Sequence, residues 1–501
     1  MLGLLSRAKG NLQNPHTATS WTPADPVPSN FTAHHRRFSL PISSLGALVF
    51  RAEGYYSKGT IQFERAGGYE PPEYDAGEGG GKDRTTGVAE VVVEARTNSA
   101  GLYSEAKLEP IEAHERCGLS LSTPSSSSVS RLGASLSFHI TVTLPATLTS
   151  LDTLSVDCSS FRILVDPSLS AVLISNLTLS TTDAPIVLGS VSAENVQLRN
   201  TNAAINSTKV ALTNFDDLVS GSIVRARRIE IDCADGPVTG SYTASGALVV
   251  LNRNAPISGT YDGSSVRIVT ANGEITGRFS AKKDIALTNT FAKIDVEVEA
   301  PLGCQVSGQN SPVSGKFRVG KELKISTTHF RIDASVRLLP PPSSSLPSSA
   351  PPPLSRTSTS TTDVPPTFEE AVGSSSSFSP SNVVQVAVET AGAAIQLDYL
   401  EQPEGVVLES RAKSSGGGGV SVTHPSGWEG SFSATASLAH SASFVSPASL
   451  GGLGGRQRKV SFDIQKRSEV AGSIAYEGEV EGRRMSRSVV ETEGSAEIKV
   501  L

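Results

Sequence analysis

Residues 248–277 read LVVLNRNAPISGTYDGSSVRIVTANGEITG, and one layout of residue types occurs twice in this stretch. Asn254 is followed by Ala-Pro-Ile and Asn272 by Gly-Glu-Ile, so isoleucine stands three positions after each asparagine. Aliphatic residues also stand six and four positions before each asparagine. The stretch therefore contains two similar units in tandem.

The unit extends in both directions along the chain. Its reference positions are Asp183, Asn202, Asp235, Asn254, Asn272 and Phe291. Positions six before, four before and three after the references are aliphatic in every unit: Leu177, Val196, Ile229, Leu248, Val266 and Ile285; Leu179, Leu198, Ile231, Val250, Ile268 and Leu287; Ile186, Ile205, Val238, Ile257, Ile275 and Ile294. The references lie 18 or 19 residues apart, except for one step of 33 residues after Asn202. A fixed period of this kind predicts a repeat architecture.

The spacing within each unit predicts its local structure. Residues two apart in a strand lie on the same face, so the first two aliphatic columns predict one strand and the third predicts a second strand after a turn. Two short strands cannot enclose their own apolar face, but units stacked about 4.8 Å apart bury a continuous aliphatic stripe. The sequence therefore predicts an all-β fold, a β-solenoid or parallel β-helix-like stack of about 19-residue rungs.

A polar column accompanies the aliphatic ones. Two residues before the references stand Thr181, Asn200, Cys233, Asn252, Thr270 and Asn289. Small polar groups repeated at one corner of a stack favour a ladder of side-chain hydrogen bonds between rungs.

Composition divides the chain into four regions. Residues 1–86 are polar and broken by Pro and Gly, which predicts a largely disordered N-terminal region with a hairpin at 45–63. Residues 87–338 are predicted to form the solenoid with N-terminal cap strands. A Pro/Ser-rich disordered insert follows at 339–382, and the solenoid pattern returns in 383–501, for example at Val386, Val388 and Ile395.

Charge, cysteine usage and hydropathy restrict the class of protein. The net charge of −6 supplies no basic field, so we expect no nucleic-acid partner. The four cysteines are dispersed without a C-x-x-C pair, which favours reduced thiols over disulfides or zinc. Charged residues interrupt the apolar start of the chain, and no run approaches the ~18 apolar residues of a membrane span. We therefore expect a cytoplasmic protein. Exposure at the cell surface would require unconventional export.

Three motifs carry a resemblance to a known family. They are the T/N-x-N/D-A-P-I-x-G unit, the stretch THPSGWEGSF at 423–432 and the stretch VAGSI at 470–474. Together they resemble an adhesin-like β-solenoid domain of uncharacterised fungal proteins, which is itself similar to a bacterial adhesin-type domain. The resemblance covers roughly residues 151–501, and it implies an architecture and no established reaction.

A search for catalytic motifs gives little. Parallel β-helices that cleave polysaccharides carry several carboxylates on successive rungs, but only the pair Asp216-Asp217 fits, and a solvated loop explains it better. The eight histidines show no ligand spacing, and the glycine-rich stretch at 77–81 lacks the residues of a phosphate loop. We therefore predict no catalytic residue, no metal site and no cofactor.

Two Pro-rich motifs indicate a binding function. A P-P-x-Y motif and a variant with Phe in place of Tyr occur in the polar regions, and WW domains bind such preformed polyproline turns. The candidate partner-binding residues are Pro71, Pro72 and Tyr74, and Pro365, Pro366 and Phe368.

Basic pairs precede several serines at the spacing that basophilic kinases prefer. Arg36-Arg37 precedes Ser39, and Arg483-Arg484 precedes Ser486, so both serines are candidate phosphorylation sites.

Three functional hypotheses follow from the sequence. The favoured one is a non-enzymatic scaffold or binding protein of unknown ligand that recruits WW-domain partners. The second is a cell-surface or cell-wall adhesin, and the third is a carbohydrate-active β-helix enzyme with carboxylates in a flank groove.

Overall fold

The computed structural model describes residues 31–43, 45–67, 86–113, 115–124, 134–207, 223–340, 382–446, 458–476 and 485–501. Most of these residues are in β-strands, and they belong to two compact units. The first unit comprises Met1–Ala300, Gln305–Lys316 and Ser326–Ile332, and the second comprises Pro301–Cys304, Phe317–Ile325 and Asp333–Leu501. The predicted all-β class is confirmed.

The described residues of the first unit form twenty strands, one short α-helix and one 3-10 helix. They are β1 (Thr32–Ser43), β2 (Ala47–Glu53), β3 (Lys58–Arg65), β4 (Thr86–Thr97), α2 (Ala100–Glu105), β5 (Lys107–Ala113), β6 (Arg116–Ser122), β7 (Leu136–Leu144), β8 (Ser150–Cys158), β9 (Ser160–Val165), η1 (Pro167–Ala171), β10 (Leu173–Thr181), β11 (Ile186–Leu188), β12 (Val191–Asn200), β13 (Ile205–Ser207), β14 (Ile223–Ala226), β15 (Arg228–Cys233), β16 (Val238–Ala244), β17 (Ala247–Asn252), β18 (Ile257–Thr270), β19 (Ile275–Asn289) and β20 (Ile294–Ala300). Residues of β21 (Gly303–Gly308), β22 (Val313–Val319), β23 (Glu322–Thr327) and β24 (Ile332–Leu338) are divided between the two units.

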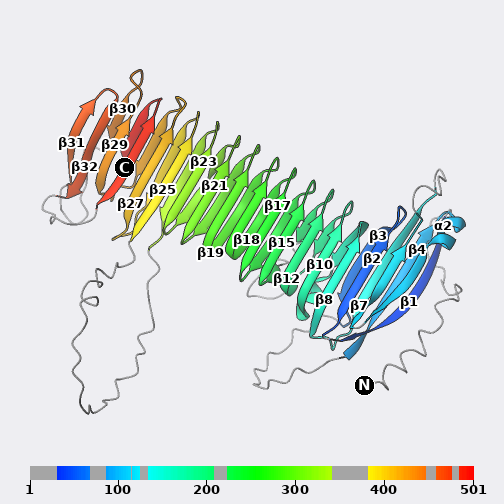
Figure 1. Ribbon diagram of the computed structural model, residues 1–501. Coiled ribbons are helices and arrows are strands. Elements are labelled where there is room, and N and C mark those ends of the chain that lie inside the picture. The colour runs from blue at the N-terminus through cyan, green and yellow to red at the C-terminus, as the bar shows by residue number, and fades with distance from the viewer. Residues whose placement is uncertain are drawn as a thin grey trace, which may run out of the picture. The chain divides into compact units, whose positions relative to one another are not determined.

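The rungs of the first unit stack in the predicted register. Leu198 of β12 pairs with Ile231 of β15, Ile231 with Val250 of β17, and Val250 with Ile268 of β18, all in parallel. Figure 1 shows β8, β10, β12 and β15 side by side in this order. All eighteen aliphatic positions are at most 2% exposed. Because each such side chain contributes about 1.5–3 kcal/mol when it is buried, the stacked columns are a main source of stability.

Each rung has two strands that belong to opposite walls of the stack. β8, β10, β12, β15 and β17 pair in one wall, whereas β9, β11, β13 and β16 pair in the other. The long strand β18 contributes to both walls, since Ile257 pairs with Val238 and Val266 pairs with Leu248. The 33-residue step does not disturb this register, because β13 pairs directly with β16. Asp216-Asp217 in this step lies outside the described residues.

A stack of aromatic rings fills the core beside the aliphatic columns. Tyr242, Tyr261 and Phe279 come from consecutive rungs and are fully buried. Their ring centroids are 5.5 and 5.2 Å apart, and the rings are nearly parallel. The repeat thus places aromatic rings, as well as aliphatic side chains, at paired positions in consecutive rungs.

The predicted ladder of side-chain hydrogen bonds lies in a different column from the one expected. The column two residues before the references is buried, whereas the reference column itself is exposed. The buried column caps the turns: Asn289 Nδ2 donates to the carbonyl of Gly273 (2.8 Å), and its Oδ1 accepts from the amide nitrogens of Phe291 and Ala292 (3.2 Å each). The ladder between rungs lies in the exposed reference column instead, where Asn272 Nδ2 donates to Asn254 Oδ1 (2.7 Å). Buried polar groups need several partners, and the turn backbone supplies them more completely than a neighbouring side chain.

The N-terminal strands correct the prediction of a hairpin at 45–63. β2 and β3 do not form a hairpin: β2 pairs in parallel with β6 and β8, and β3 with β7 and β9. β2 and β3 form a rung with β6 and β7 on one side and β8 and β9 on the other, and all four of these strands come later in the sequence. The described residues 31–43 and 45–67 are therefore mostly strand, because their alternating apolar residues bury one face in the stack.

Antiparallel strands close the N-terminal end of the first unit. β4 pairs antiparallel with β7 and with β1, and β5 pairs antiparallel with β6. β4 is thus one of the N-terminal cap strands predicted for residues 87–338. A change from parallel to antiparallel pairing ends the repeat and protects the open edge of the stack.

The part of the second unit that the structure describes contains ten further strands. They are β25 (Val383–Thr390), β26 (Ile395–Glu401), β27 (Val407–Ser414), β28 (Val420–His424), β29 (Gly430–Thr435), β30 (Ala442–Val445), β31 (Arg458–Lys466), β32 (Glu469–Tyr476), β33 (Ser486–Thr492) and β34 (Ala496–Val500). β25 pairs with β27 and β26 with β28, again in parallel. Val386, Val388 and Ile395 are buried as predicted.

The last rung of the second unit is out of chain order. β33 lies between β27 and β29, and β34 lies between β28 and β30. The chain reaches these strands only after the antiparallel pair β31–β32. The C-terminal rung therefore fills a place between two rungs that precede it in the sequence.

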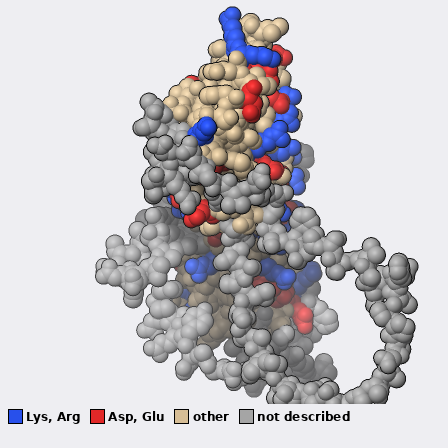
Figure 2. Space-filling view, turned by 90° about the vertical axis from the view of Figure 1, so that its left-hand side faces the viewer, with Lys and Arg blue, Asp and Glu red and all other residues tan. Residues whose placement is uncertain are grey.

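The described surface is mixed in charge. Figure 2 shows acidic and basic side chains interspersed among uncharged residues on the face that it presents. No helix in the described part of the chain has the length and apolar character needed to cross a bilayer.

Candidate functional site

The structure places the predicted site residues unevenly. All six Pro-rich motif residues lie outside the described ranges: Pro71, Pro72, Tyr74, Pro365, Pro366 and Phe368. Their use in binding remains a prediction.

The two candidate phosphorylation sites differ in accessibility. Ser39 is exposed on β1, opposite Glu90 of β4. Ser486 is only 4% exposed, and its Oγ accepts hydrogen bonds from Gln402 Nε2 (3.0 Å) and the Leu408 amide (3.1 Å). This corrects the expectation at Ser486, because a kinase cannot reach its hydroxyl while β33 stays in place.

A shallow hollow of about 430 Å³ lies on the outer face of the first unit. Its walls come from β2, β6 and β8, which pair side by side. The residues that line it are Leu45, Ala47, Val49, Arg51, Glu115, Arg116, Asp152, Thr153 and Ser155. The hollow exists because short side chains of β2 and β8 lie beside Gly118 of β6, whereas long side chains stand around them.

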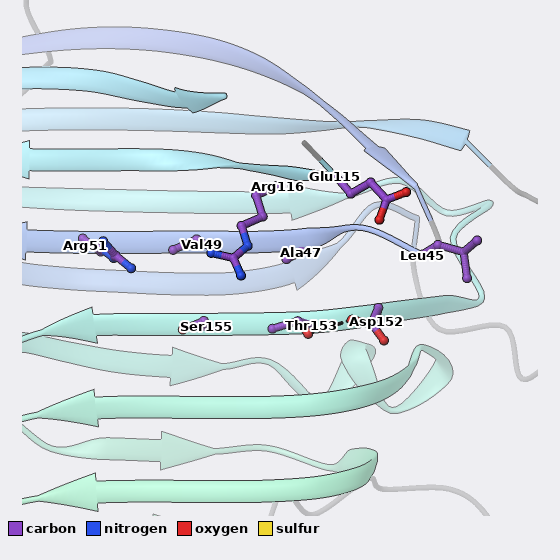
Figure 3. A pocket seen from close by; sticks show the side chains of 9 residues that line it. All are labelled: Leu45, Ala47, Val49, Arg51, Glu115, Arg116, Asp152, Thr153 and Ser155. Atoms are coloured by element: carbon purple, nitrogen blue, oxygen red, sulfur yellow. Dashed lines mark hydrogen bonds between the residues drawn. The ribbon is translucent and has the colours of Figure 1, made fainter. Parts of the chain in front are cut away.

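The polar groups of the hollow are of both charges. Figure 3 shows Arg116 extending from β6 across β2, with Arg51 farther along β2 and Glu115 and Asp152 toward the other end. Thr153 Oγ1 donates a hydrogen bond to Asp152 Oδ2 (2.9 Å). Guanidinium groups and hydroxyls of this kind can bind a carboxylate or a polyol, and the carboxylates can accept hydrogen bonds from a ligand.

The backbone at the rim of the hollow is unusual. Glu115 has φ of 59°, and it is the only residue other than glycine with positive φ in the described part of the chain. Its carbonyl accepts a hydrogen bond from the Ala47 amide (2.7 Å), which ties the β5–β6 turn to β2. The repeat period could not predict this hollow, because its walls come from three segments that the period does not relate.

A second cluster of chemically capable groups is buried in the second unit. His424 stacks between Tyr399 and Trp428, with ring centroids 5.0 and 4.2 Å away. Its Nε2 lies 2.9 Å from Ser488 Oγ, and Tyr399 donates to Ser410 Oγ (2.6 Å). Burial lowers the pKa of His424 to about 3, so the imidazole is neutral at physiological pH.

This cluster resembles part of a nucleophilic site in its residue types, but its geometry is that of a core network. His424 and Ser488 are 0% exposed, so no substrate reaches them in the folded chain. The motif THPSGW noted in the sequence therefore has a structural role, in which His424 and Trp428 fill the interior of the stack.

The thiols are also structural. Cys158, Cys233 and Cys304 are buried, and Cys117 is half-buried; all four are unpaired. Burial raises the pKa of Cys158 to about 12 and the pKa of Cys117 and Cys233 to about 11. The Cys233 thiol donates to the Gly236 carbonyl (3.1 Å), in the same turn-capping column as the asparagines. Thiols of this kind are protonated and unreactive at neutral pH.

The asparagines of two glycosylation sequons lie within hydrogen-bonded rungs. Asn176 Oδ1 accepts from Asn195 Nδ2 (3.1 Å), and Asn206 Oδ1 accepts from Thr239 Oγ1 (2.7 Å). Among the described residues, no three His, Cys, Asp or Glu side chains are grouped so that they could hold a metal ion.

Comparisons with known proteins add no assignment. No family model, curated protein or solved structure matches this chain.

Proposed function

We propose that this chain is a non-enzymatic scaffold that presents Pro-rich segments to WW-domain partners from a rigid β-solenoid. The observation that carries the proposal is the position of the segment that contains Pro365, Pro366 and Phe368. It leaves the second unit after β24 and rejoins it at β25, while β24 pairs directly with β26. The strands that precede and follow the segment in the chain therefore belong to neighbouring rungs of one stack.

The chemistry of the two Pro-rich motifs favours recognition over catalysis. Proline restricts the unfolded chain, so a polyproline turn loses little entropy when it binds an aromatic groove. Tyr74 would add a hydroxyl that can hydrogen-bond in such a groove, whereas Phe368 would supply a ring alone. We therefore expect the first motif to bind more tightly than the second.

The polar hollow is better suited to ligand binding than to glycoside hydrolysis. A glycosidase needs one carboxyl group in apolar surroundings, so that it stays protonated as the general acid. Glu115 is exposed to solvent, and Asp152 accepts a hydrogen bond from Thr153. Arg51 and Arg116 supply two cationic groups at the same hollow, so a ligand that carries a carboxylate suits it.

Isothermal titration of the full chain with a purified WW domain tests the scaffold proposal. We expect binding that weakens about tenfold or more, equivalent to ~1.4 kcal/mol, in Tyr74→Ala. Phe368→Ala should produce a smaller loss. The matched controls Tyr69→Ala and Phe378→Ala remove aromatic rings outside the motif spacing and should leave binding unchanged.

Two results would overturn the proposal. One is the absence of binding across a panel of WW domains. The other is an equal loss of binding in the motif variants and their controls, which would mean that the aromatic rings act without regard to the P-P-x-Y spacing.

A further inference from the structure

The C-terminal rung of the second unit occupies a slot between strands that precede it in the chain. β33 has β27 on one side and β29 on the other, and β34 has β28 and β30. Both walls of the slot thus come from residues 407–445, which precede the rung in the chain. This order distinguishes the C-terminal rung from the regular rungs of the repeat, each of which stacks on the one before it.

Inside the slot, hydrogen bonds fix the register of the rung. Ser486 accepts from Gln402 and from the Leu408 amide, and Ser488 bonds His424. Thr492 Oγ1 donates to the carbonyl of Gly418 at 2.5 Å. Aliphatic side chains would tolerate a slip along the strand, whereas these directional bonds specify one position.

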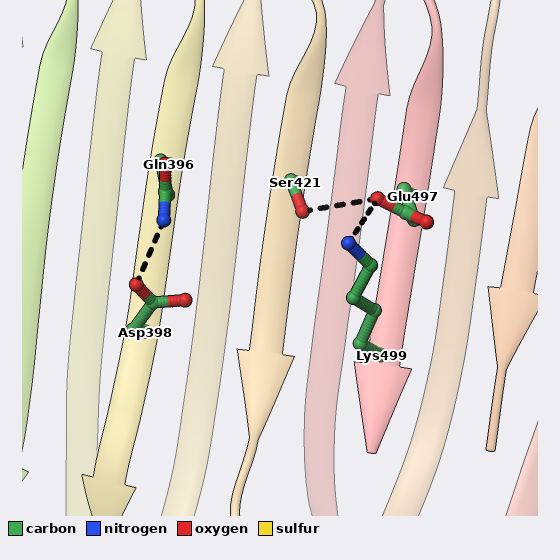
Figure 4. Close-up of polar contacts among 5 residues, drawn as sticks. All are labelled: Gln396, Asp398, Ser421, Glu497 and Lys499. Carbon is green, nitrogen blue, oxygen red and sulfur yellow. Dashed lines mark hydrogen bonds and ion pairs between the residues drawn. The ribbon is translucent and has the colours of Figure 1, made fainter. Parts of the chain in front are cut away.

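Polar contacts also join the rung to its neighbours on both outer faces. Arg411 of β27 forms an ion pair with Glu491 of β33 (3.0 Å). On the other face, Ser421 of β28 donates to Glu497 Oε2 of β34 (3.3 Å), and Lys499 pairs with the same carboxylate (2.9 Å), as Figure 4 shows. The slot therefore recognises residues 486–500 through their side chains as well as their backbone.

A single strand, β29, separates the start of the C-terminal rung from β32, the strand before it in the chain. Ile474 of β32 and Ser486 of β33 both pair with Gly430 of β29, from opposite sides. The residues between them span two strand spacings, or about 9.6 Å. Eleven residues lie between them in the sequence, which is long enough for the rung to fill the slot of its own chain.

We propose that the C-terminal rung is exchangeable, and that its alternative partner is a second copy of this chain. The contacts of Ser486, Ser488, Glu491, Thr492 and Glu497 described above join the rung to residues 402–445, so these contacts also form when the two segments belong to different copies. Exchange then produces a domain-swapped dimer. Its main free-energy cost is the loss of the high effective concentration that the covalent link gives the rung in the monomer. This inference does not depend on the WW-domain proposal.

Two full-length single-cysteine variants test the exchange. Ser421→Cys marks the slot and Glu497→Cys marks the rung; the two positions face each other across β28 and β34. The variants are mixed, warmed to open the last rung, cooled and oxidised with oxidised glutathione. We expect a disulfide-linked dimer of two 52.2 kDa chains that contains one of each variant and disappears on reduction.

A matched control replaces Ser421→Cys by Gln396→Cys. Gln396 of β26 pairs with Ser421, so it lies one strand farther from Glu497 (Figure 4). Two strand spacings, about 9.6 Å, exceed the ~7 Å limit between the Cα atoms of a disulfide. We therefore expect no specific cross-link from this mixture, and the native thiols contribute equally to both mixtures.

The double variant Ser421→Cys/Glu497→Cys reports on the unexchanged fold. Its intrachain disulfide ties the rung to its own slot, so after the same thermal cycle native mass spectrometry should find dimer for the unmodified chain and monomer for the tied variant. Two results would overturn the proposal: mixed single variants that cross-link no more than the Gln396→Cys control, or dimer formation that the tie does not suppress.

Discussion

The Nε2 atom of His424 lies 2.9 Å from Ser488 Oγ, and both side chains are 0% exposed. The contact joins β28 to the C-terminal rung in the interior of the second unit. Because burial holds the pKa of His424 near 3, this imidazole stays neutral in the folded chain far below its ordinary titration range.

The first prediction is a loss of stability in acid that depends on His424. The unfolded chain takes up a proton near pH 6.5, whereas the folded chain resists it until about pH 3. Stability is therefore fully present above pH 6.5 and falls below it, by up to about 1.4 kcal/mol per pH unit. Urea unfolding at several pH values measures this slope, with Trp428 as the reporter in a Trp21→Phe background.

His424→Gln provides the comparison for this measurement. Glutamine can keep a hydrogen bond to Ser488 but cannot ionise, so its unfolding free energy should depend less on pH. Carboxylates contribute equally to both proteins and cancel in the difference. Parallel pH profiles for the two proteins would contradict a buried neutral imidazole.

The second prediction concerns the aliphatic columns. Leu248 is 0% exposed in the core, whereas Leu251, three residues later in β17, points outward. Leu248→Ala should destabilise the chain by about 2–5 kcal/mol because it removes buried contacts and leaves a cavity. Leu251→Ala, the same substitution on the other face, should cost clearly less. Equal shifts in urea midpoint would mean that the columns do not form the core.

The third prediction separates the two polar columns. Asn289 is buried and satisfies one carbonyl and two amide groups of its turns, whereas Asn272 is exposed. Asn289→Ala removes the side-chain partner of the Gly273 carbonyl and the Ala292 amide, whereas the Phe291 amide keeps its bond to the Ala271 carbonyl, and it should cost about 1–3 kcal/mol or more. Asn272→Ala removes one exposed ladder bond and should cost less than about 1 kcal/mol. Thermal unfolding of the two variants distinguishes them, and the reverse order would restore the ladder as the main polar stabiliser.

The fourth prediction concerns thiol reactivity. Since burial raises the pKa of the thiols, the native chain should react slowly with a thiol-specific reagent at pH 8, and all four cysteines should react rapidly in urea. Cys117 is the one half-buried thiol, so we expect it to react first. Removal of the fastest phase by Cys117→Ser would confirm this order. A fast native phase that persists in Cys117→Ser would contradict it.

The regular rungs could be predicted from the sequence because residues close together in the chain determine their strands and turns. Spacings of two, three and six residues set strand faces and turns, and the period then aligned Leu198 with Ile231 and Val250. The same reasoning did not reveal the order of the end rungs. Alternation in residues 47–53 predicts a strand, but nothing in the alternation specifies that β6 and β8 will lie beside it.

The candidate sites show the same limit. The hollow needs Arg51, Arg116 and Asp152 from three separate segments, and no period connects them. Ser486 matched a kinase spacing in the sequence, but its burial depends on a strand order that the spacing does not contain. Side-chain chemistry was thus visible in the sequence, whereas accessibility required the structure.

The position of β2 and β3 has a consequence for how the chain is made. These strands emerge early from the ribosome, yet their neighbours β8 and β9 end at Cys158 and Val165. At about 5–20 residues per second, translation leaves the first rung waiting some 5–20 s for both flanks. During that interval its apolar face is exposed to solvent and to nascent-chain chaperones.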